Sequence, residues 1–523
     1  MVLHKMFRST MTVSLMTLLS RITGLVRDIA FAQFLGSGLV ADAFFVAFRI
    51  PNFFRRIFAE GAFSAGFVPV YAEYESRYPA PQVRAFLDLM LGRLALILLL
   101  FTLLGVLGAP WLVTIIAPGF VEHPDKYAAT VEALRFTFPY LFFVSLVAMA
   151  GGILNTRGRF AVPAITPVFL NLFLIGAVIW AVPFATHKAL TLGIGVFVAG
   201  VVQLGFQLPF LAFERRLPFP KIMTGKGTQA VAADGVGRVF SLMLPALFGV
   251  SVAQINLLIN TVLASFLVTG SVSWLYYSDR LMEFPVGVFG IALATVILPK
   301  LSKQVAENAV EQYRQTIDWA LRLALLVVCP AAVALVVLAH PLMLTLFQYG
   351  EFTDEDARMA ARSLVAFSPG LIGFVLVKVL APGFFARKDT KTPVRAGVIA
   401  MAVNGLCAAA LTLAVPLGHV GLAAATSISG LVNAGLLYRY LVRDSGYMSG
   451  PGMSGFAVKT AAAAIVMGVV LWFGVPDRQF WVAASVAGRL WQLVMWVSAG
   501  TVVYFVCLYV VGLKPHRLFQ RQT

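Results

Sequence analysis

The sequence predicts an all-α polytopic membrane protein of about fourteen transmembrane helices. They form two six-helix lobes related by a pseudo-twofold axis, plus two extra C-terminal helices. Three observations support this fold class. The 523 residues have a mean hydropathy of +0.87, with 60% hydrophobic and 12% charged residues. Apolar runs of about 20 residues, enough to cross roughly 30 Å of hydrocarbon, recur along nearly the whole chain. The two halves also repeat one another.

The apolar runs indicate helices and not strands, because they are continuous and do not alternate with a period of two. Arg21, Arg27 and Asp28 interrupt the first run, which we interpret as a retained first helix and not as a signal peptide. The predicted spans are 11–34, 38–60, 87–117, 130–152, 161–183, 190–213, 237–266, 272–299, 315–338, 355–382, 392–414, 417–441, 456–475 and 486–512.

Loops rich in basic residues alternate along the chain with loops that are poor in them. Every second loop is rich in Lys and Arg, whereas the loop after His340 is acidic. The basic loops include Arg157 and Arg159, Arg215 and Arg216, Lys300 and Lys303, Arg387 and Lys388, and Arg439 and Arg443. Since loops rich in Lys and Arg stay in the cytoplasm, these loops and both termini are predicted to be cytoplasmic.

An internal repeat has a constant offset of 230 residues. It relates Pro69 to Pro299, Asp88 to Asp318, Pro139 to Pro369, Arg157 to Arg387 and Pro163 to Pro393. Six spans are thus duplicated in the same orientation, which is the parallel-repeat arrangement of transporters that place substrate at the repeat interface. We predict an N-terminal lobe at 1–225, a C-terminal lobe at 226–446, and two further helices at 447–523.

Charged residues occur where a bilayer disfavours them, because a charge at mid-membrane costs about 2.5–3.5 kcal/mol on insertion scales. They lie within or at the rims of apolar stretches and include Arg21, Arg27, Asp42, Arg49, Arg55, Arg56, Arg280 and Glu283. Arginine binds phosphate through a planar fork and does not lose its proton. The pattern predicts a water-filled, positively charged cavity for an anionic cargo.

The spacing of these charges predicts their partners. Asp42, Arg49 and Arg56 are seven apart and share one helix face, and Arg280 and Glu283 are three apart and can pair. Arg56 and Glu60 are predicted as a gating or rim pair. For each single arginine, an internal ion pair is the alternative, since Asp42 and Glu283 could neutralise two of them.

Other function classes have little support in the sequence. The net charge of +17 is accompanied by no nucleic-acid-binding motif, and basic loops facing anionic lipid explain it better. The six histidines and three cysteines form no ligand motif, so we expect no metal and no cofactor. Hydrolase and nucleotide-binding motifs are absent from the sequence, so we expect a transporter and not an enzyme.

Four segments resemble one family. They are SRITGLVRD (20–28), ADAFFVAFRIPNFFRRIFAEGAFSAGFVPVYAEY (41–74), SWLYYSDRLMEFPVGVFGIALATVILPKLS (273–302) and VKVLAPGFFARKDTKTPV (377–394). They are similar to the MurJ/MviN lipid II flippases of the multidrug/oligosaccharidyl-lipid/polysaccharide exporter superfamily. The resemblance implies that Arg21, Arg27, Arg55 and Arg280 bind substrate, that Asp42 and Glu283 are associated acids, and that the last two helices form a groove for a lipid tail.

The function that the resemblance implies is transport of undecaprenyl-diphosphate-linked peptidoglycan precursor from the inner to the outer leaflet of the bacterial cytoplasmic membrane, by alternating access. Lipid II and membrane lipids are the expected partners, with cell-wall synthesis enzymes as further candidates. One alternative is a cation-coupled exporter of drugs or polysaccharide lipids with the same fold. Another is a non-transporting scaffold for cell-wall assembly, in which the cavity arginines would be dispensable. An intramembrane transferase would need a base or nucleophile that the sequence does not offer.

Overall fold

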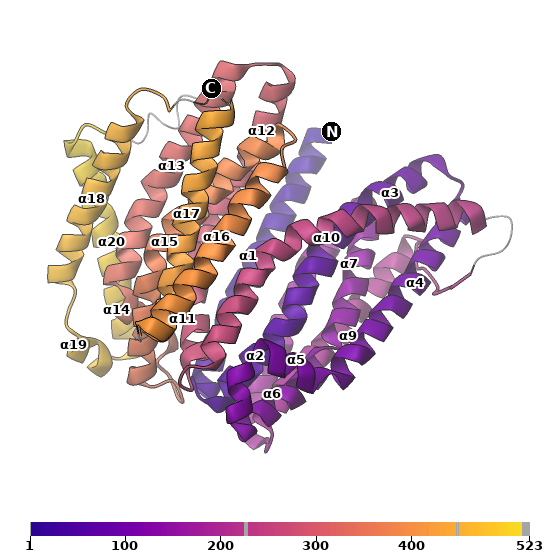
Figure 1. The fold of residues 1–523 in the computed structure, drawn as a ribbon, viewed down its shortest axis with the longest axis horizontal. Helices are drawn as coiled ribbons and strands as arrows, with labels where there is room; N and C mark the ends of the chain where they lie inside the picture. Colours follow the sequence, from indigo (N-terminus) through magenta and orange to yellow (C-terminus); the bar gives the residue numbers. More distant parts are fainter. Residues whose placement is uncertain (1, 224–228, 416, 446, 448, 515–523) are drawn as a thin grey trace. The chain divides into compact units, whose positions relative to one another are not determined.

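The computed structural model describes residues 2–223, 229–415, 417–445, 447 and 449–514, without the side chains of 2–10, 59–60, 229, 246, 248–253, 291, 413 and 444–445. Within these ranges the chain is helical throughout and contains no strand. It divides into two compact units, Met1–Gly270 and Ser271–Thr523. Figure 1 shows both units as bundles of long helices, as the sequence predicts for the fold class.

The first unit holds the helices numbered up to α10. They are α1 (Val2–Leu35), α2 (Leu39–Arg55), the π-helix η1 (Arg56–Ala62), α3 (Phe63–Arg77), α4 (Ala80–Leu107), α5 (Ala109–Ile116), the 3-10 turn η2 (Pro118–Glu122), α6 (Pro124–Thr137), α7 (Tyr140–Thr156), α8 (Ala161–Gly176), the π-helix η3 (Ala177–Ala181), η4 (Val182–Phe184), α9 (Lys188–Phe213) and α10 (Gln229–Ser265).

The second unit holds the rest. They are α11 (Ser271–Pro285), the π-helix η5 (Val286–Gly290), α12 (Ile291–Ala306), α13 (Val310–Val337), α14 (Ala339–Phe347), α15 (Asp354–Ala386), α16 (Lys391–Ala409), the π-helix η6 (Ala410–Ala414), α17 (His419–Ser445), α18 (Met453–Gly474), α19 (Arg478–Ala483) and α20 (Val486–Val510). Figure 1 shows α18 and α20 along one edge of this unit, and both pack against α13.

Every predicted span falls on a helix. Among the described residues, 11 helices are long and apolar enough to cross a membrane. The three remaining predicted spans, 11–34, 38–60 and 237–266, fall on α1, on α2 with η1, and on α10. Seven of the nine predicted site residues lie on α1, α2 and η1, and the other two, Arg280 and Glu283, lie on α11.

The helix boundaries follow the predicted offset of 230 residues. Helices α4 and α13 both have 28 residues and begin at Ala80 and Val310. The run Pro124–Thr156 corresponds to α15, Asp354–Ala386, with 33 residues each. The π-helices η1 and η5 begin at Arg56 and Val286, again 230 apart. The duplication is therefore visible in backbone irregularities as well as in sequence.

Two predicted spans are broken where glycine or proline interrupts the helical hydrogen bonding. The predicted span 87–117 divides at Gly108, and Pro110 then lies in the first turn of α5. The run containing the predicted span 130–152 divides at Phe138 and Pro139. In α15 the equivalent proline, Pro369, is accommodated within one helix.

Close packing in each unit depends on small and aromatic residues. In the first unit, Phe63, Phe67 and Tyr71 of α3 form a stack with ring centroids 5.0 and 5.6 Å apart. In the second unit, α15 and α17 approach at Gly373 and Gly430, where a Cβ on Gly373 would lie 2.4 Å from the Gly430 carbonyl carbon. A larger residue at Gly373 would force the helices apart.

Helix α10 packs on η1, α3 and α4, which explains why the first compact unit extends to Gly270. By the sequence repeat, α10 instead corresponds to α1, because both helices end 230 residues apart at Leu35 and Ser265. The predicted boundary at 225/226 describes the repeat and remains a prediction. The boundary by packing lies after α10.

Repeat-equivalent aspartates anchor the chain that follows each set of six spans. Asp88 accepts hydrogen bonds from the Phe219 amide and the Lys221 ammonium, both at 2.8 Å. Asp318 accepts from the Tyr447 hydroxyl at 2.5 Å and the Gly450 amide at 3.0 Å. Both carboxylates are buried, so they fix each outgoing linker to the start of α4 or α13.

Replacing Asp318 by Ala is expected to destabilise the protein by about 1–3 kcal/mol, because the Tyr447 hydroxyl and the Gly450 amide lose their acceptor. Thermal unfolding in detergent measures the loss. The matched variant Asp318→Asn keeps one carbonyl acceptor and should lose less. Unfolding of the Ala variant at the parent temperature would show that the anchor contributes nothing.

Candidate functional site

Arg27 of α1 is buried and held by neighbours on two helices. Its Nε and Nη2 donate to Oδ1 of Asp28 at 3.0 and 2.7 Å, and its Nη1 donates to Oδ1 of Asn171 on α8 at 3.0 Å. The guanidinium also lies over the Phe31 ring, 5.6 Å from the centroid. A single orientation of the fork is therefore fixed by an acid, an amide and an aromatic ring.

Asn171 in turn is fixed by α1. Its Nδ2 donates to the Ser20 carbonyl and to the Thr23 hydroxyl, both at 3.0 Å. Gly24 faces the same amide, since a Cβ there would lie 3.6 Å from Nδ2. The α-helix continues without interruption through Gly24.

Arg21 lies six residues before Arg27 on α1 and is half-buried. Among the described residues it has no hydrogen-bond or ion-pair partner. The charge of Arg27 is already shared with Asp28, whereas the charge of Arg21 is available to an anion.

The three residues of α2 and η1 that are spaced seven apart all meet α10 or the chain that follows it. Nη1 of Arg49 donates to the Thr261 hydroxyl at 2.9 Å. Nη1 of Arg56 approaches Oε1 of Gln254 at 3.4 Å. Thr261 and Gln254 are also seven apart, so the side chains that meet Arg49 and Arg56 lie on one face of α10.

Asp42, the first of the three, is completely buried, and one of its partners is a lysine. Its Oδ2 lies 2.8 Å from Nζ of Lys126 on α6 and accepts the Gly270 amide at 2.8 Å. Lys126 also lies over the Phe120 ring at 4.2 Å. Asp42 thus joins α2, α6 and the chain after α10. Its predicted pairing with a cavity arginine stays a prediction.

The remaining predicted residues of η1 and its approach have local contacts. Arg55 is half-buried and its Nε donates to Oδ1 of Asn52 at 3.1 Å. The side chain of Glu60 lies outside the described residues, so its predicted pairing with Arg56 stays a prediction.

In the second unit, Arg280 of α11 pairs with Glu283. Its Nη1 donates to Oε2 at 3.0 Å, at the three-residue spacing that predicted the pair. The guanidinium lies over the Tyr276 ring at 4.8 Å. Both side chains are partly exposed, 34% and 45%, so the arginine is neutralised but still accessible.

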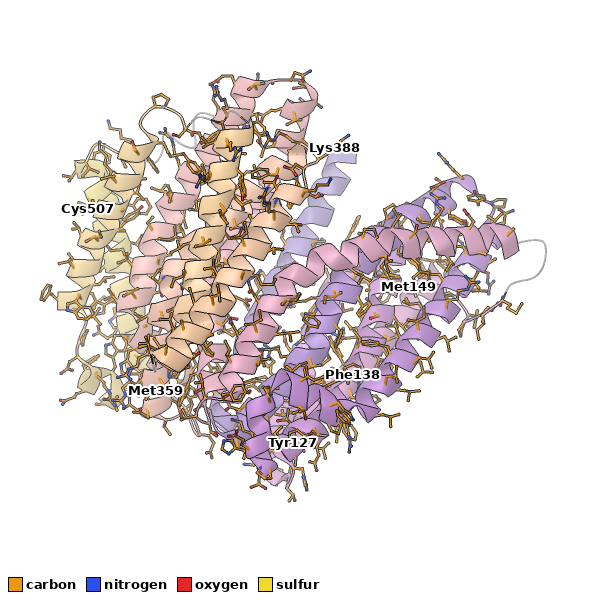
Figure 2. The ribbon with its side chains drawn as sticks, viewed as in Figure 1. Tyr127, Phe138, Met149, Met359, Lys388 and Cys507 are labelled. Carbon is orange, nitrogen blue, oxygen red and sulfur yellow. The ribbon has the colours of Figure 1, made fainter. Side chains whose placement is uncertain are left out.

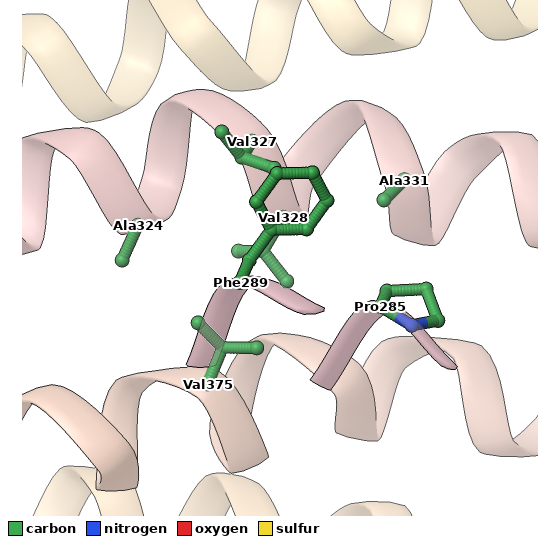
Figure 3. Close-up of a pocket in the computed structure, with 7 residues that line it drawn as sticks. All are labelled: Pro285, Phe289, Ala324, Val327, Val328, Ala331 and Val375. Carbon is green, nitrogen blue, oxygen red and sulfur yellow. The ribbon is translucent and has the colours of Figure 1, made fainter. Parts of the chain in front are cut away.

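A small apolar pocket of about 10 Å³ adjoins the π-helix η5, less than two turns beyond Arg280. Figure 3 shows Val327, Val328 and Ala331 of α13 on one side and Phe289 and Val375 on the other. Its lining consists of Pro285, Phe289, Ala324, Val327, Val328, Ala331 and Val375. A lining of this kind offers no polar group to a ligand.

Sequence reasoning missed Lys126, Asn171 and Thr261, which hold three of the predicted charges. Lys126 was a lone cation before an apolar run, and Asn171 a lone amide within one, and such residues have no motif. Among the described residues, no three His, Cys, Asp or Glu side chains gather in a way that could hold a metal ion.

Long apolar helices in a duplicated arrangement, with arginines on α1, α2 and α11, define a multi-pass membrane transporter fold. A multidrug transporter of the MATE family in an inward-facing conformation has this fold, with a TM-score of 0.67 at 15% identity over 82% of this chain and 95% of that one. Residues 31–490 match the family described as lipid II flippase MurJ, and the chain belongs to that family.

Individual relatives agree over nearly the full length. The chain is 43% identical to a probable lipid II flippase MurJ of Haemophilus influenzae, over 97% of this chain and 100% of the relative. It is 38% identical to the lipid II flippase MurJ of Burkholderia cenocepacia, over 99% of each. A solved lipid II flippase MurJ in an inward closed conformation superimposes with a TM-score of 0.79 at 25% identity, over 95% of this chain and 98% of that one.

Proposed function

We propose that this chain moves undecaprenyl-diphosphate-linked peptidoglycan precursor, lipid II, from the inner to the outer leaflet of the bacterial cytoplasmic membrane by alternating access. Membership of the lipid II flippase family supports this cargo. The observation that carries the proposal is the half-buried Arg21 on the same helix as the oriented Arg27, within the predicted span 11–34. Cations kept in an apolar setting are expected to serve an anion such as a diphosphate.

In this proposal Arg21, Arg27 and Arg55 of the first unit and Arg280 of the second bind the diphosphate. Asp28 and Asn171 pre-orient Arg27, so little side-chain entropy is lost when phosphate binds. Glu283 holds Arg280 until cargo replaces it. Such exchangeable pairing lets the arginines bind and then release the headgroup, which a transport cycle requires.

The lipid tail is proposed to lie along α18 and α20. Both helices expose apolar side chains, including Val458, Ile465, Trp472, Trp491, Val494 and Phe505. Polar contacts fasten α20 to the second unit: the Tyr504 hydroxyl donates to the Leu326 carbonyl at 2.8 Å, and Arg489 donates to the Leu344 carbonyl at 3.2 Å. A fixed apolar surface of this kind suits a long isoprenoid chain.

The proposed orientation places both termini in the cytoplasm. Four highly exposed tryptophans support it, because Trp111, Trp180, Trp472 and Trp491 all occur at helix ends opposite the basic loops. Tryptophan gathers at membrane interfaces, so these residues mark the predicted periplasmic boundary. We propose transport without bond chemistry, and cell-wall synthesis enzymes as partners that receive the cargo.

The proposal is tested by reconstituting the full chain into vesicles and measuring which leaflet exposes lipid II. We expect lipid II to become accessible on the opposite leaflet faster than in protein-free vesicles, and faster than a lipid-linked oligosaccharide without the peptide. Equal rates for both lipids would favour a general exporter of this fold. No acceleration of either would favour a scaffold.

A further inference from the structure

The segment 387–395, which joins α15 to the first turns of α16, carries four cations. Lys388, Lys391 and Arg395 are exposed, and Arg387 is partly buried under the rings of Tyr313 and Phe384. Figure 2 shows Lys388 at one tip of the second unit. Among the side chains that the structure describes, none of these four cations forms an ion pair.

Asp389, the one acid in this segment, is already engaged. Its Oδ1 accepts the backbone amides of Lys391 and Thr392, both at 3.0 Å, and so caps the start of α16. Burial opposes ionisation, but hydrogen bonds from Thr392 and Lys391 and the charge of Arg387 outweigh it and hold the pKa of Asp389 below its usual value. Asp389 is thus shared between the helix terminus and Arg387, and three of the four cations remain in excess.

The repeat-equivalent segment of the first unit, 157–165, is neutralised. Arg157 lies 2.9 Å from Glu75 and 3.3 Å from Glu214, and Arg159 lies 2.7 Å from Glu214. The hydrogen bond from Arg159 lowers the pKa of Glu214, so the acid stays charged. The basic loop of the first unit has its charges paired, so a basic loop can orient the chain in the membrane without unpaired cations. The equivalent loop of the second unit leaves its cations without ion pairs.

Lys388 also occupies a backbone conformation that a lysine disfavours. Its φ is 60°, in the left-handed region, while the residue 230 positions earlier, Gly158, has φ 78°. Glycine adopts this conformation without the steric cost that an L side chain incurs. Since one repeat uses glycine and the other keeps lysine, the strain points to a function for the lysine side chain.

We propose that Arg387, Lys388, Lys391 and Arg395 bind the phosphate of an anionic phospholipid headgroup. The segment links two helices that are each apolar enough to span a membrane, so it lies at the depth of lipid headgroups. The guanidinium fork and the ammonium groups match phosphate oxygens, and each basic side chain near an anionic surface contributes roughly a fivefold gain in affinity. This site is separate from the proposed cargo arginines and goes beyond the proposed flippase activity.

The test uses the full chain in detergent and measures retention of phosphatidylglycerol by native mass spectrometry, with phosphatidylcholine for comparison. We expect Lys388→Gly to weaken phosphatidylglycerol retention about fivefold. The same variant should unfold at a higher temperature than the parent without lipid, because the strain is relieved. Lys300→Gln, which removes an exposed cation of α12, is the matched control and should retain the lipid.

Three outcomes would contradict the proposed lipid site. Retention by Lys388→Gly equal to that of the parent would overturn the site, and so would an equal loss in Lys300→Gln, which would indicate diffuse attraction only. Displacement of phosphatidylglycerol by millimolar inorganic phosphate would show that the segment binds phosphate from solution and would overturn the lipid assignment. None of these results depends on lipid II transport, so the proposed function is tested separately.

Discussion

Replacing Arg27 by Ala is expected to abolish growth of a strain that depends on this protein for its flippase, while the variant still inserts in the membrane. Losing charge-assisted hydrogen bonds to phosphate costs about 1.5–3 kcal/mol, which corresponds to a fall in cargo affinity of about 10- to 160-fold. Lipid II binding to the purified variant measures the loss directly. Arg27→Lys keeps the charge but loses the fork that Asp28 and Asn171 orient, so it should recover only part of the affinity.

A control is needed because Arg27 and Asp28 are both buried, 8% and 3% exposed. Removing the arginine alone leaves the acid without this partner, and breaking a buried pair is destabilising by about 3–5 kcal/mol. The double variant Arg27→Ala, Asp28→Ala removes both charges. It should be more stable than the single variant and still fail to bind lipid II. Normal growth of either variant would contradict a role of Arg27 in cargo binding.

A variant of Asn171 tests the orientation of the Arg27 guanidinium without removing its charge. Asn171→Leu leaves Arg27 and Asp28 in place but removes the amide that joins Arg27 to Ser20 and Thr23. If pre-orientation matters, this variant binds lipid II more weakly than the parent and more tightly than Arg27→Ala. Affinity equal to that of the parent would mean that Asp28 alone orients the fork.

The spans were predictable because hydropathy over about 20 residues is a local property of the sequence. The repeat was predictable because its offset is constant, and it extends to boundaries such as Ala80 and Val310. The π-helices were not predictable, since a shift in hydrogen bonding over one turn leaves hydropathy unchanged. Pairing on one helix, as for Arg280 and Glu283, followed from spacing alone.

Partners from distant parts of the chain could not be predicted. Arg27 meets Asn171 across 144 residues, and Arg49 meets Thr261 across 212. Nothing in the local sequence marks these amide and hydroxyl groups as partners of arginine. The same limit applies to Asp42, whose spacing with Arg49 and Arg56 placed it on the correct face but could not identify Lys126.

Replacing Lys126 by Met is expected to destabilise the protein by about 3–5 kcal/mol, because Asp42 then stays buried as a charge without its ammonium partner. Both side chains are almost completely buried, 2% and 0% exposed, so water cannot replace the lysine. The double variant Asp42→Asn, Lys126→Met removes both charges. Its asparagine oxygen can still accept the Gly270 amide that Asp42 accepts at 2.8 Å.

Thermal unfolding of the parent, the two single variants Asp42→Asn and Lys126→Met, and the double variant forms a double-mutant cycle. We expect a coupling energy of about 0.5–3 kcal/mol between the two residues, and recovery of most of the stability in the double variant. Additive losses would show that the two charges act independently. Lipid II transport by the double variant then assigns Asp42. If the double variant recovers both stability and transport, Asp42 serves only to join α2, α6 and the chain after α10. A stable but inactive double variant means that the charge of Asp42 itself takes part in the transport cycle.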